Sequence, residues 1–236
     1  FALVFILFQG GFGIRRSDFK TVALPAGGLA VWGVLLTAGA TFLALWQGLG
    51  WPVEKAGLLA AIISSTDAAA TFSILRRFTL PRKLSSTLVI ESAANDPMAV
   101  LLTVVAVQAL AYGHARGPGL LFDFVWKFAA GPILGWGMGR AAVWLFNKLR
   151  PQDRGHYYVL FFGIVLLTYG LAEHVRVSGM LAVFIAGYVM GNHPFVHKQG
   201  VANFSAAFAS VANIATFILL GLLVFGQAPG EIFRGL

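Results

Sequence analysis

Two short polar stretches contain the side chains best suited to ion chemistry, and both interrupt apolar segments. The first covers residues 64–67 and reads Ser-Ser-Thr-Asp; the second covers residues 91–97 and reads Glu-Ser-Ala-Ala-Asn-Asp-Pro. The second lies inside an apolar segment from about Leu84 to Tyr112, which is long enough to cross a bilayer. A carboxylate at the bilayer centre costs at least about 2.5 kcal/mol, so such groups normally face a bundle interior or an ion pathway. These carboxylates therefore indicate ion or proton movement.

Oxygen atoms are the possible ligands in these stretches. Asp96, Ser92 and Thr66, together with free backbone carbonyls, suit an alkali cation. The chain has no cysteine, the ligand that would favour a soft transition metal. Pro97 lacks the amide that would bond the carbonyl of Ala93, so we expect a disturbed helix and a free carbonyl there. Burial and a neighbouring carboxylate both favour a neutral acid, so the same site can hold a proton instead of a cation.

Depth and helical spacing are expected to bring the two stretches together. Thr66 and Asp67 lie near the middle of their apolar segment, and Asp96 lies about 20 Å along its own segment at the helical rise of about 1.5 Å per residue. Glu91 and Asn95 are four residues apart and share one face of a helix. A set of carboxylates at one depth is therefore predicted near the membrane midplane.

The composition is that of an integral membrane protein built from helices. Hydrophobic residues make up 58% of the chain and charged residues 11%, against about 25% charged in soluble domains. The 28 glycines and 21 phenylalanines suit helices that pack closely through small residues and face lipid with large ones. The formal charge of +8 is confined to short connections, a pattern of membrane topology and not of a nucleic-acid surface.

About eight membrane spans are predicted from apolar segments long enough to cross the hydrocarbon core. They cover about 1–14, 21–46, 55–76, 84–112, 120–147, 156–174, 177–192 and 202–226. The seventh is short and interrupted by glycine. Because 76–83 is a tight basic turn, we expect the third and fourth segments to pack side by side. Glycines spaced four apart predict close packing in the fifth and seventh segments, at Gly131, Gly135, Gly139, Gly187 and Gly191.

Lysine and arginine residues are concentrated in alternate connections, which predicts the orientation of the chain. The richer connections contain Arg15, Arg16, Lys20, Arg76, Arg77, Arg82, Lys83, Lys148, Arg150, Arg154 and Lys198. By the positive-inside rule these connections are cytoplasmic, and the alternation agrees with eight spans. Lys127 and Arg140 fall within the fifth segment, where snorkelling or a tilted helix accounts for them.

The two polar stretches, with their flanking residues, resemble a known family. Residues 65–76 read Ser-Thr-Asp-Ala-Ala-Ala-Thr-Phe-Ser-Ile-Leu-Arg, and the second stretch continues as Met-Ala-Val to residue 100. This pair of motifs resembles the first family of monovalent cation/proton antiporters within the sodium/hydrogen exchanger superfamily. The likeness is greatest to its bacterial potassium/proton branch, the cell volume regulation proteins. It extends along nearly the whole chain, including residues 217–224.

The resemblance implies a role for each residue of the site. Asp96 is expected to bind the monovalent cation or the proton, with Asn95 as the companion found in electroneutral members. Thr66 and Ser92 are expected to be further ligands. The fold implied is an all-α polytopic bundle of the inverted-repeat type with discontinuous helices, in which a core domain moves against a dimerisation domain.

Asp67 is expected to stabilise the crossing of the two discontinuous helices. Glu91 is expected to be structural and to pair with an arginine on a later core helix, outside this sequence. Residues 1–236 are accordingly expected to be a fragment of a sodium/hydrogen exchanger transmembrane domain whose first and last spans are missing. Without the arginine, the buried acid of Glu91 loses its partner, so an inactive antiporter fragment is one alternative.

The implied function is a secondary transporter and not an enzyme. It exchanges K⁺, or Na⁺ as a second possibility, for H⁺ without net charge movement, by alternating access around the midplane carboxylate, and it needs no cofactor. The expected location is the bacterial inner membrane, as a multi-pass homodimer in the lipid bilayer without nucleic-acid partners. A cation channel would use the same acids. An intramembrane aspartyl hydrolase is a further alternative, although Asp67 and Asp96 lack the flanking glycine motif it would need.

Overall fold

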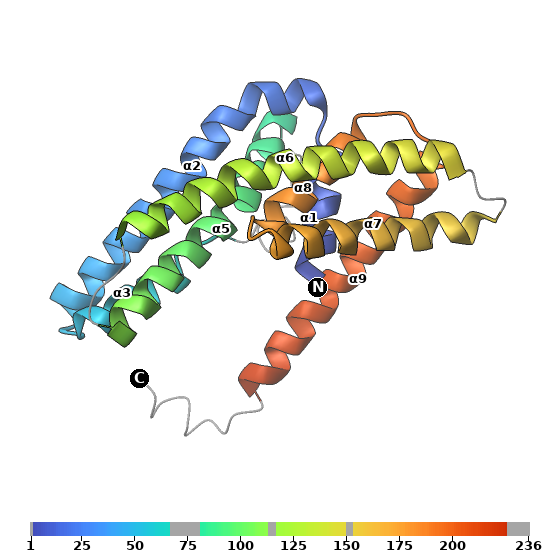
Figure 1. The fold of residues 1–236 in the computed structure, drawn as a ribbon. Coiled ribbons are helices and arrows are strands. Elements are labelled where there is room, and N and C mark those ends of the chain that lie inside the picture. Colours follow the sequence, from blue (N-terminus) through green and yellow to red (C-terminus); the bar gives the residue numbers. More distant parts are fainter. Residues whose placement is uncertain (1, 67–80, 113–116, 150–152, 226–236) are drawn as a thin grey trace.

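The computed structural model describes residues 2–66, 81–112, 117–149 and 153–225, and all regular structure in these ranges is helical (Figure 1). Each of the eight predicted segments contains a helix, so the predicted all-helical fold is confirmed. The helices are α1 (Ala2–Gly13), α2 (Arg16–Leu43) with a π-helical end η1 (Ala44–Gly48), α3 (Val53–Ile62), α5 (Arg82–Tyr112), α6 (Gly117–Leu149), α7 (Arg154–His174), α8 (Gly179–Gly191) and α9 (Lys198–Phe225). The basic turn at 76–83 lies mostly outside the described residues.

The helices differ in how far they can reach across a membrane. Within the described ranges, three stretches are both long and apolar enough to cross it, namely Arg16–Gly48, Gly155–His174 and Lys198–Leu223. With 31 and 33 residues, α5 and α6 are also long enough, but they contain more polar groups. By contrast, α1, α3 and α8 have 10 to 13 residues each, which is too few to cross the hydrocarbon core.

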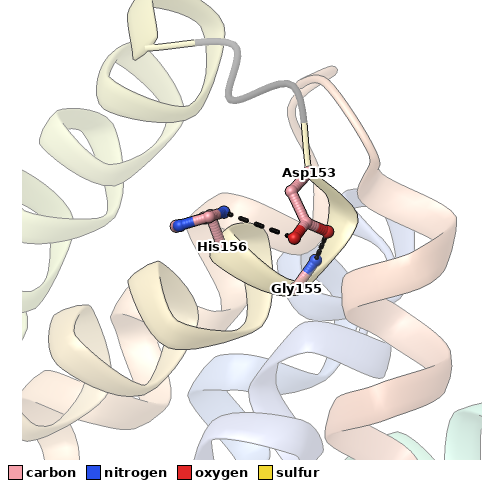
Figure 2. A network of polar contacts seen from close by, with 3 residues as sticks. All are labelled: Asp153, Gly155 and His156. Carbon is pink, nitrogen blue, oxygen red and sulfur yellow. Dashed lines mark hydrogen bonds and ion pairs between the residues drawn. The ribbon is translucent and has the colours of Figure 1, made fainter.

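Side-chain caps explain where two helices begin. Figure 2 shows Asp153 accepting a hydrogen bond from the amide of Gly155 at 3.0 Å, with His156 Nδ1 at 3.9 Å from the same carboxylate. This cap satisfies an amide that has no partner within the helix, and α7 therefore starts two residues before the expected boundary. Ser178 caps α8 in the same way by accepting from the amide of Leu181.

The seventh predicted span, α8, lies at the centre of the packing. It lies between α1 and α6 and also contacts α7 and α5 (Figure 1). Nine of its 13 residues are buried. Because protein and not lipid surrounds it, α8 needs neither the length nor the large apolar side chains of a lipid-facing span.

Glycines let α1 and α6 approach the backbone of α8. A Cβ atom added to Gly135 would collide with the carbonyl of Ala182, and one added to Gly187 would collide with the carbonyl of Phe8. The same holds along both interfaces, at Gly11, Gly187 and Gly191 between α1 and α8, and at Gly131, Gly135 and Gly139 between α6 and α8. The predicted close packing through glycine is confirmed.

Two apolar clusters hold the helices together. The larger cluster joins α1, α6, α7, α8 and α9 through phenylalanines that meet mainly edge to face, with Phe8 and Phe161 at its centre. A second cluster joins α2 and α5 to α1 and α8, through Val22, Ile90 and Phe184. In Figure 1, α2, α3 and α5 lie together on one side, and α7 and α9 lie on the other. The predicted side-by-side packing of α3 and α5 is confirmed.

Three of the connections predicted to be cytoplasmic meet at one end of the bundle. Asn192, just after α8, accepts from the amide of Arg16 and donates to the carbonyl of Ile14, both at 2.8 Å. Asn147, near the end of α6, accepts from the amide of Val196 at 3.0 Å. Lys198 Nζ donates to the carbonyl of Gly191 at the same end. The arrangement agrees with the alternation of basic residues along the chain.

The outer surface of the bundle is strongly apolar. Leu24 is 88% exposed, Leu36 69% and Leu223 70%, and many other large apolar side chains on α2, α6 and α9 are exposed as well. Contiguous apolar surface of this extent is stable only when protein or hydrocarbon covers it. The fold therefore has the surface of a protein that lies in lipid.

Candidate functional site

A break in the helical backbone forms one half of the site. Helix α3 ends at Ile62, and the chain is non-helical at Ser65 and Thr66. The buried hydroxyl of Ser64 donates to the carbonyl of Ala61 at 2.7 Å, which satisfies one of the carbonyls freed at the end of a helix. The chain therefore leaves the helix at the predicted polar stretch, as far as Thr66 is described, and the carbonyl of Thr66 faces α5.

The other half of the site is α5, which is helical from Arg82 to Tyr112. The expected disturbance at Pro97 is therefore wrong as regards the backbone, since the helix continues through it. A proline removes one hydrogen bond of the helix, and a helix of 31 residues that packs against α2 and α3 can continue without it. The backbone carbonyl that the described site does show is that of Thr66, beyond the end of α3, and the free carbonyl expected at Ala93 stays a prediction.

Hydrogen bonds join the end of α3 to α5. The hydroxyl of Thr66 lies 3.1 Å from each carboxylate oxygen of Glu91, to which it donates. In turn, the hydroxyl of Ser92 donates to the backbone carbonyl of Thr66 at 2.8 Å. Both Glu91 and Ser92 are buried, at 8% and 6% exposed. Thr66 is therefore held to α5 through both its side chain and its backbone.

Asn95 completes this cluster from the next turn of α5. Its side-chain amide donates to Glu91 Oε1 at 3.0 Å and to the hydroxyl of Thr66. The contact with Glu91 confirms that these two residues, four apart, share a helix face. Asn95 is fully buried, and its Oδ1 atom accepts no hydrogen bond from the described residues. A buried amide oxygen without a donor is an available ligand for a cation.

The carboxylate of Glu91 receives hydrogen bonds but no ion pair from the part of the chain that the structure describes. Two neutral donors, the Thr66 hydroxyl and the Asn95 amide, face it. Taking a carboxylate out of water is costly unless charge-assisted bonds compensate for the lost hydration. Among the described residues, these two neutral donors are therefore the partners of the buried Glu91 carboxylate.

A cavity of about 310 Å³ lies beside this cluster, between α2 and the α3–α5 pair. Glu91, Thr66 and Ser64 contribute polar atoms to its wall. The remaining lining residues are Leu29, Gly33, Val34, Thr37 and Leu88. The cavity is large enough to hold several water molecules, each of which occupies about 30 Å³ in the liquid.

The contribution of α2 to this cavity was not expected from the sequence. Leu29, Gly33 and Thr37 are spaced four apart, so they fall on one face of a helix. A small residue and a hydroxyl on that face leave space and a polar atom beside Glu91. This four-residue spacing is visible in the sequence, and it is the signal that could have identified α2 as part of the cavity lining.

The structure brings four of the six predicted site residues together. Thr66, Glu91, Ser92 and Asn95 form one hydrogen-bonded cluster. Asp67 lies outside the described residues, as does the side chain of Asp96, whose backbone is part of α5. The roles of these two acids therefore stay predictions from the sequence.

Replacing Thr66 by Val should destabilise the full-length protein by about 1–3 kcal/mol, because a buried carboxylate loses a donor while the volume of the side chain is kept. The measurement is the shift of the thermal unfolding midpoint in detergent. Thr37→Val is the matched control, since Thr37 lines the same cavity without bonding Glu91. An equal shift in both variants would contradict the importance of the Thr66–Glu91 contact.

Comparison with known proteins identifies the family. A family model described as "Sodium/hydrogen exchanger, transmembrane" matches residues 1–233. The chain belongs to this family. The exchanger motifs at residues 65–76 and 91–100, on which the resemblance rests, thus lie within a match along nearly the whole chain. The family expected from the sequence is confirmed.

Curated relatives of the chain are named as antiporters. The chain is 37% identical to the K(+)/H(+) antiporter NhaP of Alkalimonas amylolytica and 35% identical to NhaP2 of Shewanella oneidensis, covering 94% and 95% of this chain. It is 29% identical to the Na(+)/H(+) antiporter NhaS2 of Synechocystis. The chain spans about two-fifths of the length of these relatives, 39% of the first two and 42% of the third.

A solved exchanger structure has the same fold. The sodium proton antiporter MjNhaP1 of Methanocaldococcus jannaschii superposes with a TM-score of 0.71 at 23% identity, over 93% of this chain and 55% of that protein. At this level of identity the comparison shows the arrangement of helices alone. The helical bundle described above is therefore that of this transmembrane family.

Proposed function

We propose that the full-length protein containing this chain is a secondary transporter that exchanges a monovalent cation for H⁺ without net charge movement. The observation that carries the proposal is the buried oxygen cluster of Thr66, Glu91, Ser92 and Asn95 at a break between helices. Such a cluster offers hard oxygen ligands, lacks a positive partner among the described residues and lies beside a cavity. Transporters of this kind bind their ions where helices are interrupted near the midplane.

Asp96 is the proposed exchange site in this scheme. It follows Asn95 directly on α5, one helical turn after Ser92. Its carboxylate binds either the cation or the proton, and Thr66, Ser92 and Asn95 supply neutral oxygens around the cation. Asp67 stabilises the crossing of the helices. Glu91 holds the broken end of α3 against α5, a structural role that its bonds to Thr66 and Asn95 support.

Exchange requires the site to open to one side at a time. Because one carboxylate binds either a cation or a proton, each replaces the other and the two fluxes are coupled. The proton gradient can then drive the cation in the opposite direction. K⁺ is the favoured cation and Na⁺ the alternative, since relatives at 35–37% identity are named K(+)/H(+) antiporters and a more distant one is named a Na(+)/H(+) antiporter.

We place residues 1–236 within one exchanger transmembrane domain, as part of a multi-pass protein of the bacterial inner membrane that is a homodimer when complete. The packing of α2, α3 and α5 on one another, and the larger apolar cluster, which joins α1 and α6–α9, support a division into these two groups. In the proposed mechanism the first group moves against the second, and the second carries the dimer contact.

The test uses full-length protein reconstituted into vesicles that contain a pH-sensitive dye and an imposed pH gradient. Addition of KCl should dissipate the gradient and restore fluorescence, NaCl should do so more weakly, and clamping the membrane potential should not change the rate. A flux that follows the membrane potential and does not move protons would instead identify a channel. Failure of both salts to move protons would contradict the proposed exchange.

A further inference from the structure

Helix α6 carries two cations on the face that points away from its neighbours. Gly135, Gly139 and Ala142 are buried on the side that packs against α8. Arg140, Trp144 and Lys148 are spaced four apart and exposed, so they form one stripe on the opposite side. We call these three residues the α6 stripe.

Two side chains of the stripe, Lys148 and Trp144, are in contact. Lys148 Nζ lies 4.5 Å from the centre of the Trp144 ring, one turn back along the helix. A helical side chain covers the turn before its own position, so Lys148 lies over Trp144 and Trp144 leans toward the turn of Arg140. The tryptophan, 58% exposed, lies between the two cations. Two positive groups thus flank one aromatic ring on the exposed face of α6.

The depth of the stripe corresponds to the boundary between hydrocarbon and headgroups. Helix α6 is about 50 Å long at a rise of about 1.5 Å per residue, whereas the hydrocarbon core is about 30 Å thick. If the length of α6 beyond the hydrocarbon core is shared equally between its two ends, Lys148 and Trp144 lie among the headgroups. Arg140, about 13 Å before the helix end, lies a few ångströms inside the hydrocarbon. Tryptophan is enriched at this boundary, and an arginine there requires an anionic partner or water.

The protein itself does not supply that partner from the part of the chain that the structure describes. Neither Arg140 nor Lys148 forms an ion pair there, and the ion pair found at this end joins His156 to Asp153. Toward the middle of α6, Ile133 and Trp136 are exposed at 70% and 58%. An exposed apolar helix face that leads to two cations matches a molecule with acyl chains and a negative headgroup.

We propose that the α6 stripe binds an anionic phospholipid, whose phosphate contacts Arg140 and Lys148 and whose glycerol region packs on Trp144. The acyl chains lie along the exposed apolar side chains toward the middle of α6. The lipid neutralises Arg140 at a depth that water reaches poorly. This site is separate from the exchange cluster on α3 and α5.

Native mass spectrometry of the full-length protein tests the site with phosphatidylglycerol and phosphatidylcholine at equal concentration. Wild type should bind phosphatidylglycerol preferentially. In Arg140→Gln/Lys148→Gln the affinity should fall about 10- to 30-fold, because each basic residue contributes about one kilocalorie per mole near an anionic surface. An absent preference in wild type, or a preference retained in the double variant, would overturn the proposal.

The control variant removes the same charge elsewhere. Lys20→Gln/Lys127→Gln changes one exposed lysine at the same end of the bundle and one on α6 itself. It should bind phosphatidylglycerol as wild type does. An equal loss in both double variants would show that net charge, and not the stripe, attracts the lipid.

Tryptophan fluorescence gives a second measurement that does not depend on the charge variants folding. Brominated phosphatidylglycerol should quench wild type more than brominated phosphatidylcholine does. This difference should disappear in Trp144→Phe, which keeps an aromatic ring on α6. The same difference in wild type and variant would place the lipid elsewhere on the protein and refute the site.

Discussion

Replacing Asp96 by Asn in the full-length protein should reduce cation-dependent recovery of the pH dye to the level of vesicles without protein. Asparagine keeps the size of the side chain and one oxygen, so binding of a neutral ligand would change little. It cannot take up or release a proton, and it lacks the charge that compensates a bare cation. Exchange needs one group that both takes up and releases a proton and compensates the charge of the cation. The loss of transport should therefore be complete and not partial.

Asp153→Asn is the matched control for this substitution. Asp153 undergoes the same chemical change, but its side chain is 74% exposed and caps α7. Asparagine is about as good a helix cap as aspartate. Transport should therefore stay at the wild-type rate. Wild-type rates in the Asp96 variant would refute the assignment of the exchange site.

The largest effect on stability is expected for Gly135→Leu. A Cβ at this position would overlap the backbone of Ala182, with the Cα atom 2.8 Å away, and a backbone cannot rotate aside as a side chain can. Helices α6 and α8 would have to separate, and overpacking of this kind costs about 1–3 kcal/mol and occasionally more. We expect at least about 3 kcal/mol here, because α8 contacts four other helices. The measurement is thermal unfolding of the full-length protein in detergent.

Gly137→Leu tests whether the effect belongs to the contact. Gly137 lies two residues along the same helix and is exposed, and a Cβ added there would meet no atom within 4 Å. Leucine has a higher helix propensity than glycine by about 0.5–1 kcal/mol, so this variant should be as stable as wild type or more so. If both variants lost equal stability, the interlocking of α6 and α8 would not be the cause.

Periodicity and charge predicted most of the fold because each acts locally. The eight apolar segments, the packing of α3 on α5 and the glycine contacts all follow from residue type and spacing. The central position of α8 did not follow. It was predicted as a span although it is short and interrupted by glycine, and these properties suit a helix that is mostly buried in protein. Hydropathy indicates how well a helix is suited to contact lipid, and a helix surrounded by protein does not need that property.

The site was predictable as a set of residues and less so as a geometry. The four-residue spacing of Glu91 and Asn95 placed them on one face, and the structure adds the bond between them. The sequence did not indicate that Thr66 would bond Glu91 directly, since this contact joins residues 25 apart across a helix break. Pro97 was misleading about the backbone, because a membrane helix packed against neighbouring helices can continue past a proline.

The way α8 meets its neighbours has a mechanical consequence. On the sides facing α1 and α6, glycines bring backbone against backbone, so those helices cannot slide along α8 without steric overlap. Toward α2 and α5, the described contacts are between side chains, such as the stacking of Phe19 on Tyr188. Hydrogen bonds cross this second boundary at Asn192, which holds the start of α2. Asn192 therefore fastens the start of α2 to the end of α8, so that these two ends share one fixed point whatever the side chains between them do.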